Sequence, residues 1–313
     1  MLLRQLEYVT ALARERHFAR AAAVCHVSQP SLSAGIAKLE SELKVTIVVR
    51  GRRFAGFTPE GEQVVSWARR ILADRDGLAQ ELAGLRRGVG GLLRVCAIPT
   101  AVVTASMLTS ALCHAHPGVR VRLDSGSSRD IVRRLVDLDL DAGLTYTDNE
   151  SLGDAIRVVP LYREHYLALT PDDGPLDERV EVTWAEVAAL PLCLFSRDMQ
   201  HRRILDGCFA ETGVEVTPAV ETDSVAALYA HVASRRWSTV IAHVWLATFG
   251  VPEGMRVVPI TGVERTPQVG LVLAGRDPEA PLVRMLRDIA AQEDLAGRLE
   301  RLRQRYPGAP SLD

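Results

Sequence analysis

Cysteine is scarce in this sequence, and its spacing forms no recognisable framework. The 313 residues contain five cysteines, an odd number, and no two of them form a Cys-x-x-Cys pair. This count argues against a disulfide-stapled scaffold and against a structural zinc site. We therefore expect no bound metal and no cofactor.

Long apolar runs are also missing. Charged residues interrupt the apolar N-terminus at Arg4, Glu7, Arg14 and Glu15, and no later segment is continuously apolar for long. A membrane-spanning helix needs about 20 apolar residues, and a secretory signal needs an uninterrupted apolar core. The sequence therefore predicts a cytoplasmic protein without a membrane partner.

Signatures of common enzymes are absent too. The sequence has no GxSxG, phosphate-loop or HExxH motif, and its eight histidines are scattered. We expect no catalytic residues. An α/β enzyme, or a solute-binding protein that has gained a basic arm, stays open as the alternative to a regulator.

The charge that is present is unevenly distributed, although the net charge is only −2. Residues 1–94 carry 15 basic and 9 acidic residues, a net +6, whereas the remainder carries 22 basic and 30 acidic residues, a net −8. A basic N-terminal part joined to an acidic body is typical of a nucleic-acid-binding domain attached to a different domain, although compositional scatter would also produce it.

Residues 17–53 have the pattern of a helix-turn-helix. An Ala-rich helix from about Ala19 precedes a turn at His26-Val27, and Ser28 caps a second helix that has Pro30 in its first turn. Apolar residues at helical spacing predict the buried face of the second helix: Leu32, Ile36, Leu39 and Leu43. A helix tip of this kind suits insertion into a major groove.

The next segment predicts a two-stranded wing. Val45, Ile47 and Val49 alternate with other residues before an arginine-rich turn, and such arginines hold phosphates or the minor groove. A helical bundle with a solvated basic loop is the alternative. The expected DNA-contacting residues are Arg20, Ser28, Gln29, Pro30, Ser31, Ser33, Lys38, Arg50, Arg52 and Arg53.

This N-terminal third resembles a LysR-type transcriptional regulator. The resemblance is carried by Arg4-Gln5-Leu6, Ala21-Ala22, Val27 to Ser33, Ile36, Leu39-Glu40, Leu43, Arg50 and Thr58-Pro59-Glu60-Gly61. It implies a winged helix-turn-helix domain at 1–58, a linker and dimerisation helix at 59–88 and an effector-sensing domain at 89–313. It also implies four partners: double-stranded promoter DNA, a small-molecule effector, a second copy of the chain in a homodimer or tetramer, and RNA polymerase.

One departure from the family affects the second helix. Ala34, Gly35 and Ala37 stand where such proteins usually carry basic residues, and Lys38 is the only cation before Lys44. Phosphate contacts should therefore fall more heavily on the arginines of the wing.

A long helix is predicted from Thr58-Pro59 to about Arg87. Apolar residues follow an alternating four-three spacing that Arg75 interrupts: Val64, Ala68, Ile71, Leu78, Leu82 and Leu85. This coiled-coil seam predicts dimerisation. Packing of the helix against the chain's own domain is the alternative.

The body is predicted to be α/β. After the glycines at 88–91, strand and helix patterns alternate from Leu92 to Leu144, which favours a parallel sheet, and a helix from Pro281 to about Arg305 closes the chain. Two lobes joined by crossing strands resemble the periplasmic-binding-protein-like sensor domain of the family, with lobe I at 92–165 and 268–305 and lobe II at 166–267.

Polar residues at strand ends and helix starts predict a ligand site between the lobes. Hydroxyl groups at helix N-termini suit a small anion such as a carboxylate, although each hydroxyl is equally explained as a helix cap. The expected effector-binding residues are Thr100, Ser127, Ser128, Thr147, Ser196 and Thr222. His201, Arg202 and Arg203 are possible counter-charges, of which at least two are expected on a solvated surface.

A thiol-based response to oxidants is the alternative form of regulation. Cys208 resembles the second cysteine of the peroxide-sensing members of the family, but Met199 or Gln200 stands where its partner is expected, and Cys193 is a further candidate. Among the redox candidates Cys25 is preferred: if its thiol is partly exposed, Arg20, His26 and a helix N-terminus should lower its pKa. A small core residue is the favoured interpretation of Cys25.

Overall fold

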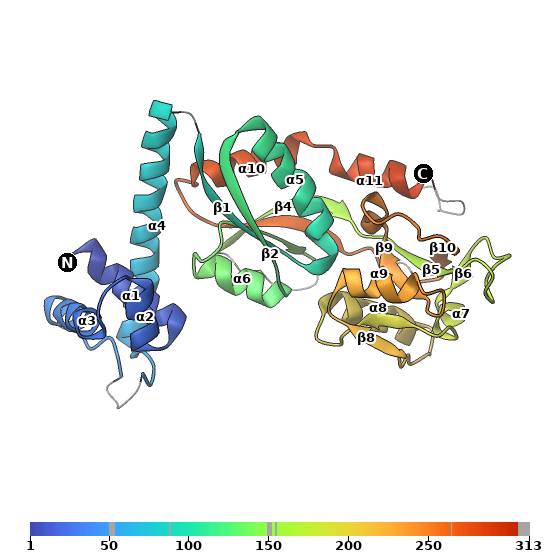
Figure 1. Ribbon diagram of the computed structural model, residues 1–313, viewed down its shortest axis with the longest axis horizontal. Helices are drawn as coiled ribbons and strands as arrows, with labels where there is room; N and C mark the ends of the chain where they lie inside the picture. Colours follow the sequence, from blue (N-terminus) through green and yellow to red (C-terminus); the bar gives the residue numbers. More distant parts are fainter. Residues whose placement is uncertain (50–53, 88, 149–151, 154, 264, 306–313) are drawn as a thin grey trace. The chain divides into compact units, whose positions relative to one another are not determined.

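The computed structural model describes residues 1–49, 54–87, 89–148, 152–153, 155–263 and 265–305. The chain divides into two compact units, Met1–Val89 and Gly90–Asp313 (Figure 1). Among the described residues, no helix has the length and apolar character that a membrane span requires.

The first unit is helical. It contains α1 (Leu3–Glu15), α2 (Phe18–Val24), α3 (Gln29–Leu43) and α4 (Pro59–Arg87), so the predicted helix-turn-helix is present. Residues of α1, α2, α3 and the start of α4 share one buried apolar cluster. His26, with a φ of 53°, makes the turn between α2 and α3.

The start of α3 forms as predicted. Ser28 is the N-cap, and its Oγ accepts the backbone N–H of Ser31 at 3.3 Å. Leu32, Ile36 and Leu39 are buried, but Leu43 is 39% exposed, so its predicted burial is wrong. Leu43 is the last residue of the helix, and Lys44 then turns the chain away with a φ of 57°.

Close packing explains the glycine in the middle of α3. A Cβ at Gly35 would lie 2.6 Å from the Cδ2 atom of Tyr8 on α1. The two helices therefore touch at this point, and no side chain fits between them. Gly35 supports the packing of the helical unit instead of facing a ligand.

Within the described part of the predicted wing, Val48 and Phe57 form an antiparallel bridge. The carboxylate of Glu40 on α3 accepts the backbone N–H groups of Ile47 at 2.7 Å and Val48 at 3.1 Å. The predicted alternation is wrong, because Val48 is buried and Val49 is 42% exposed. Side-chain anchoring by Glu40 thus acts together with backbone pairing of Val49 to Gly56 and of Thr58 to Ile47. The arginines of the turn, Arg50, Arg52 and Arg53, lie outside the described residues.

Helix α4 begins in direct contact with the wing backbone. The Oγ1 atom of Thr58 accepts the N–H of Gly61 at 2.9 Å and donates to the carbonyl of Thr46, which confirms the predicted Thr cap. A Cβ at Gly61 would lie 2.0 Å from the carbonyl oxygen of Ile47. The Thr-Pro-Glu-Gly sequence thus allows the first turn of α4 to approach the wing.

The predicted seam of α4 is divided between two environments. Ala68 is fully buried, and Val64 and Ile71 pack against the cluster shared with α1, where Arg75 also pairs with Glu7 at 2.5 Å. Ala68 therefore packs within its own chain, so the prediction that it faces a partner chain is wrong. Leu78 is 58% exposed and Leu82 is 48% exposed, and the side chain of Leu85 lies outside the described part.

The second unit contains two lobes. Lobe I has a five-stranded sheet in the order β2-β1-β3-β11-β4, in which β1 pairs in parallel with β2 and β3, whereas β11 is antiparallel to β3 and β4. In Figure 1, α5 and α10 lie on one face of this sheet and α6 on the other. The elements are β1 (Gly90–Ala97), η1 (Pro99–Ala101), α5 (Val102–Ala115), β2 (Gly118–Ser125), α6 (Ser128–Val136), β3 (Ala142–Tyr146), β4 (Ile156–Arg163), β11 (Gln268–Ala274), α10 (Pro281–Gln292) and α11 (Leu295–Arg303).

Lobe II has a four-stranded sheet in the order β6-β10-β5-β9 and a parallel pair, β7-β8. Its sheet is antiparallel at β5, so only part of the α/β body has the predicted parallel pairing. The elements are β5 (Tyr166–Pro171), β6 (Val182–Thr183), α7 (Trp184–Ala188), β7 (Cys193–Phe195), α8 (Gln200–Glu211), β8 (Val220–Thr222), α9 (Val225–Val232), β9 (Thr239–Ala242), η2 (His243–Ala247) and β10 (Met255–Thr261).

Two segments cross between the lobes, one from β4 to β5 and one from β10 to β11. The predicted single closing helix is wrong: it divides into α10 and α11, because Asp294 leaves the helical conformation and accepts the N–H of Gly297 at 2.9 Å as a new N-cap.

The contact of Gly61 with the wing predicts opposite effects for two glycine substitutions in α4. Gly61→Ala should lower the free energy of unfolding by about 1 to 3 kcal/mol, because its Cβ meets backbone that cannot move aside. Gly77→Ala is the matched control: nothing lies within 4 Å of its Cβ position, so better helix propensity should raise stability by about 0.5 to 1 kcal/mol. Urea unfolding of the three proteins measures both effects, and equal effects would contradict the close contact.

Candidate nucleic-acid interface and effector site

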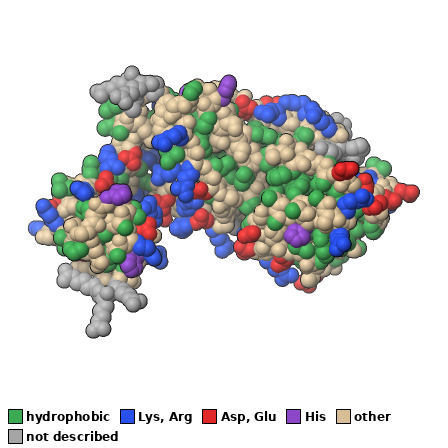
Figure 2. All heavy atoms as spheres, viewed as in Figure 1, with side chains coloured by type: hydrophobic (Ala, Val, Ile, Leu, Met, Phe, Trp, Pro, Cys, Tyr) green, Lys and Arg blue, Asp and Glu red, His purple; other side chains and the backbone are tan. Residues whose placement is uncertain are grey.

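The tip of α3 presents a set of exposed polar groups. Ser28, Gln29, Pro30 and Ser31 are exposed, and the two serine Oγ atoms lie 2.8 Å apart. Farther along the helix, Ser33 is half-buried and Lys38 is exposed. The positive end of the helix dipole and these hydroxyl and amide groups together form a surface suited to phosphates and base edges. In Figure 2, basic side chains lie around this helical unit with acidic and apolar ones between them.

Arg20 is held beside the end of α1. Its Nη2 donates to the carbonyl of Glu15 at 2.7 Å, and its Nε lies 3.7 Å from the Glu15 carboxylate. The guanidinium is 66% exposed, so it can still reach a phosphate, but Glu15 partly offsets its charge.

Cys25 does not have the environment predicted for a reactive thiol. Burial, followed by the Glu7 carboxylate, raises the pKa of Cys25, and this outweighs Arg14 and Arg4, which lower it. Its Sγ lies 3.9 Å from the carbonyl oxygen of Glu7. The predicted lowering of the pKa by Arg20 and His26 is therefore wrong, since the half-buried thiol faces the α1 side of the core.

The cysteines of lobe II are fully buried. Burial raises the pKa of Cys193 to about 11 and that of Cys208 to about 12. All five cysteines are free thiols in the structure. Within the described part of the chain, no three His, Cys, Asp or Glu side chains gather as a metal site would require.

Three of the predicted effector residues meet at a small cavity between the lobes. Thr100, Ser127 and Ser128 of lobe I face Phe195, Met199, Gln200 and His201 of lobe II. The Ser128 hydroxyl donates to Oε1 of Gln200, and the indole N–H of Trp245 donates to the carbonyl of Thr100 at 3.3 Å, so two hydrogen bonds join the lobes here. The cavity has a volume of about 20 Å³, which holds roughly one water molecule.

The other three predicted residues lie outside that lining. Ser196 donates its N–H to the carbonyl of Thr222 at 2.9 Å, so these two are neighbours at the ends of β7 and β8. Thr147 contacts the start of β11, with its Oγ1 at 3.4 Å from the carbonyl of Gln268. The six residues therefore do not form one constellation.

The basic residues of α8 are not solvated as predicted. His201 is 4% exposed and Arg202 is fully buried, whereas Arg203 is exposed. Arg202 lies 2.7 Å from the carboxylates of both Asp206 and Glu221, so its charge is already neutralised. Burial lowers the pKa of His201 to about 3, so this ring is neutral at ordinary pH.

A buried polar cluster beside the cavity was not predicted from the sequence. Glu164 in the first crossing segment is fully buried, and its Oε1 accepts the Tyr146 hydroxyl at 2.8 Å. The Tyr146 hydroxyl also lies 3.3 Å from Oγ1 of Thr100, which lines the cavity. Among the described residues, both ring nitrogens of His201 are buried without a hydrogen-bond partner.

The sequence spacing of three residues in this region could have predicted the buried polar cluster. Tyr162, Glu164 and Tyr166 alternate along extended chain, which places them on one face. A charged residue between two tyrosines on the same face indicates a buried polar site. Burial raises the pKa of Glu164 to about 7, against the hydrogen bond from Tyr146, which lowers it.

Both parts of the chain match family models. Residues 3–62 match the model described as "Bacterial regulatory helix-turn-helix protein, lysR family". Residues 86–295 match the model described as "LysR substrate binding domain". Together these two matches cover most of the chain.

The chain is similar to several regulators of known sequence. It is 30% identical over 281 residues to the DNA-binding transcriptional dual regulator OxyR of Escherichia coli K12, which covers 89% of this chain and 91% of that protein. It is 32% identical over 195 residues to the uncharacterized HTH-type transcriptional regulator YnfL of the same organism, covering 62% of this chain and 65% of that protein.

Solved structures share the fold. A full-length OxyR variant from Pseudomonas aeruginosa has a TM-score of 0.71 at 24% identity and covers 95% of this chain and 98% of its own. Full-length CbnR in complex with its target DNA has a TM-score of 0.62 at 21% identity, covering 93% and 99%.

The buried carboxyl group predicts a pH-dependent stability. The pKa of Glu164 is near 7 in the folded chain, raised from 4.5. The protonated carboxyl group therefore contributes stability that is fully present below pH 4.5 and is lost as the pH rises to about 7. The difference in the free energy of unfolding between the wild type and Glu164→Gln should therefore fall by about 3 kcal/mol from acidic to mildly alkaline pH. Urea unfolding across that range measures it. The buried histidines are common to both proteins and cancel, and a pH-independent difference would show that folding does not raise the pKa of Glu164.

The raised pKa values predict slow oxidation of three thiols. Cys25, Cys193 and Cys208 should gain little oxygen in dilute hydrogen peroxide at neutral pH, because the thiolate is the reacting form. Their reaction rates should still be rising with pH above about pH 9. Peptide mass mapping measures the products, and the same chain unfolded in urea is the control in which these cysteines become reactive. Rapid oxidation of Cys25 in the folded chain would contradict its raised pKa.

Proposed function

Because this chain belongs to the LysR family of transcriptional regulators, we propose that it binds promoter DNA as a homodimer through the tips of two α3 helices. It is a DNA-binding regulator with an effector-binding domain, and its relatives are regulators and not enzymes. The exposed Ser28-Gln29-Pro30-Ser31 tip, backed by a fully packed helical unit, is the observation that most directly supports the proposed contact.

The proposed contacts divide by chemistry. Gln29 has the amide that pairs with an adenine edge, and Ser31 and Ser33 have hydroxyls suited to bases or phosphates. Arg20 and Lys38 are exposed cations that suit phosphates. Arg50, Arg52 and Arg53 complete the proposed set as phosphate or minor-groove contacts, and Ser28 and Pro30 shape the tip.

The exposed side of α4 supports the proposed dimer. Trp67 is 60% exposed and Leu78 is 58% exposed, and their separation of eleven residues is about three helical turns, so they lie on one side of the helix. Leu82 continues this side. Large apolar side chains exposed along one helix face favour pairing with a second helix. A tetramer would require additional contact surfaces between copies of the effector domain.

The interlobe cavity supports the proposed effector site. Thr100, Ser127 and Ser128 supply hydroxyls, and the hydrogen bond from Ser128 to Gln200 would be exchanged for one to a ligand when the lobes separate. A ligand that fits between them would be small and polar, such as a short carboxylate. Ser196 and Thr222 are proposed to join it only after the lobes rearrange. RNA polymerase is the proposed partner at the promoter.

A peroxide response is the second candidate, because several relatives are named as hydrogen peroxide-inducible genes activators. One of these, from Haemophilus influenzae, is 27% identical over 89% of this chain. The buried thiols with raised pKa values favour the ligand-responsive form instead. Within the redox alternative, Cys25 remains ahead of Cys193 and Cys208 because it is the least buried of the three.

Substitution of the α3 tip tests the proposed function. Gln29→Ala should weaken binding to the intergenic fragment upstream of the target gene by about ten- to a hundredfold, since a bidentate base contact contributes about 1 to 3 kcal/mol. Binding to an unrelated duplex should not change. Fluorescence anisotropy at fixed salt measures both affinities.

Gln63→Ala is the matched control, because Gln63 is an exposed glutamine on α4, outside the tip. Its affinity for both duplexes should equal that of the wild type. Unchanged specific binding by Gln29→Ala, or equal losses on both duplexes, would contradict base recognition by this residue.

A further inference from the structure

A second cavity of the effector domain lies at the hinge, away from the hydroxyl-bearing edges of the lobes, and is larger than the interlobe cavity. It has a volume of about 590 Å³, compared with about 20 Å³ for the interlobe cavity. Sites for small organic ligands typically measure about 300 to 1,000 Å³. The hinge pocket is therefore large enough for a ligand in the conformation described, whereas the interlobe cavity is not.

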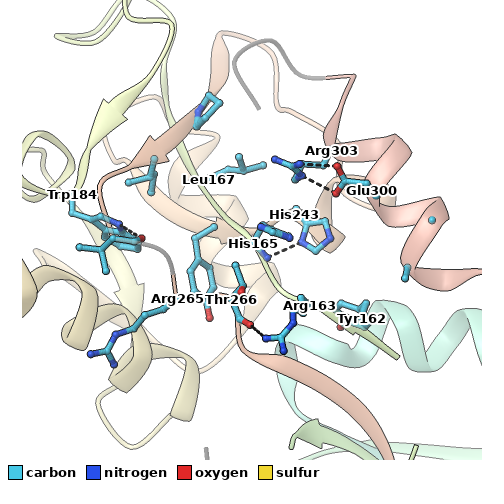
Figure 3. A pocket seen from close by; sticks show the side chains of 16 residues that line it. Tyr162, Arg163, His165, Leu167, Trp184, His243, Arg265, Thr266, Glu300 and Arg303 are labelled. Atoms are coloured by element: carbon cyan, nitrogen blue, oxygen red, sulfur yellow. Dashed lines mark hydrogen bonds and ion pairs between the residues drawn. The ribbon is translucent and has the colours of Figure 1, made fainter. Parts of the chain in front are cut away.

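Three parts of the domain build this pocket. The first crossing segment and the strands beside it contribute Tyr162, Arg163, His165, Tyr166 and Leu167. Lobe II contributes residues of α7, η2, β10 and the segment after β10, and α11 contributes Ala296, Gly297, Glu300 and Arg303. Figure 3 shows Trp184 on one side and Glu300 with Arg303 on the opposite side, with Leu167 and His165 between them.

One of the three arginines at the pocket has N–H groups to offer an anion. Arg163, Arg265 and Arg303 line it, and Glu300 is the one carboxylate among the described lining residues. Arg303 is bonded to Glu300 at 2.6 Å, and Arg265 is bonded to Glu211 at 2.7 Å. Arg163 is 58% exposed, lies 3.9 Å from the Asp148 carboxylate and gives one N–H to the carbonyl of Thr266 at 2.8 Å. A guanidinium has five N–H donors, so Arg163 has donors to offer a ligand carboxylate as well.

A neutral histidine adds a polar contact. Burial, followed by the charge of His165, lowers the pKa of His243 to about 3. Its Nδ1 accepts the backbone N–H of His165 at 3.1 Å, so the neutral ring carries its hydrogen on Nε2. The pocket lining thus contains an imidazole with an N–H donor and no charge.

Apolar side chains form the remaining wall. Leu167, Trp184, Pro259, Ile260 and Val263 line the lobe II side. On α11 the lining residues Ala296 and Gly297 are small, and the break of the C-terminal helix at Asp294 brings them to the pocket. A ligand here would therefore need both an acidic group and an apolar body.

We propose that the hinge pocket is a second ligand site, which binds a small organic carboxylate with an apolar body between the crossing segment and α11. The carboxylate lies against Arg163, and the apolar body occupies the space between Trp184, Leu167 and Ala296. Because the ligand contacts the segment that joins the lobes, its binding adjusts the angle between them. The site stands apart from the proposed interlobe effector site and does not depend on it.

Isothermal titration of the full-length chain with phenylacetate and hexanoate tests this proposal. The neutral amides phenylacetamide and hexanamide are the matched ligands of the same shape. We expect millimolar or tighter binding of both acids, with each amide weaker by about tenfold, which is the usual effect of losing a charge-assisted hydrogen bond.

Two variants locate the binding. Ala296→Leu adds carbon atoms at an exposed position that lines the pocket and should weaken both acids by at least about tenfold. Ala291→Leu, at an exposed position of α10 outside the pocket, should bind as the wild type does. Arg163→Gln should reduce the affinity of each acid to that of its amide, while Arg157→Gln, on the same strand outside the lining, should not.

The proposal is overturned if neither acid binds, if the amides bind as well as the acids, or if Ala296→Leu binds the acids as tightly as the wild type. The last result would show that the acids bind at another site, such as the interlobe cavity. Promoter binding is measured on the same preparations. A chain that binds promoter DNA but neither acid would overturn the proposed hinge site and leave the proposed DNA binding intact.

Discussion

The segment that crosses from β4 to β5 is the constraint around which the effector domain is arranged. It joins the two sheets and contributes to two sites. Glu164 is buried without solvent and accepts a hydrogen bond from Tyr146 of lobe I, next to Tyr166 of lobe II. Its neighbours Arg163 and His165 line the hinge pocket, together with Tyr162 and Tyr166. One short segment thus contributes to both sites, so a change at one site bears on the other.

The helical unit depends on a different kind of contact, the close approach of backbone to backbone. The Glu40 carboxylate holds the N–H groups of Ile47 and Val48, and Thr58 with Gly61 brings α4 against the same stretch. Buried N–H groups must find partners, so these bonds hold the wing and α4 to the back of α3. The tip of α3 is thereby held in one packed unit with the wing and the start of α4.

The two cavities of the body suggest how it can respond to small molecules. The interlobe cavity is nearly filled and is crossed by hydrogen bonds from Ser128 and Trp245, so a ligand there must compete with contacts between the lobes. The hinge pocket is open without any rearrangement. A ligand shifts the equilibrium between conformations only by its difference in affinity for them, so two sites of such different accessibility can respond to different compounds.

Local sequence patterns determined the helix-turn-helix, its Ser28 cap, the long α4 and the alternation of strands and helices, because capping and hydrophobic periodicity act over a few residues. The tertiary structure alone decided three further features. It turned Ala68 and Ile71 of α4 toward α1, since a helix buries its apolar side against whichever surface its fold brings near. It raised the pKa of Cys25, and it buried Glu164, His201 and Arg202, because desolvation depends on neighbours distant in the chain. The hinge pocket arose in the same way, from three segments that no local pattern connects.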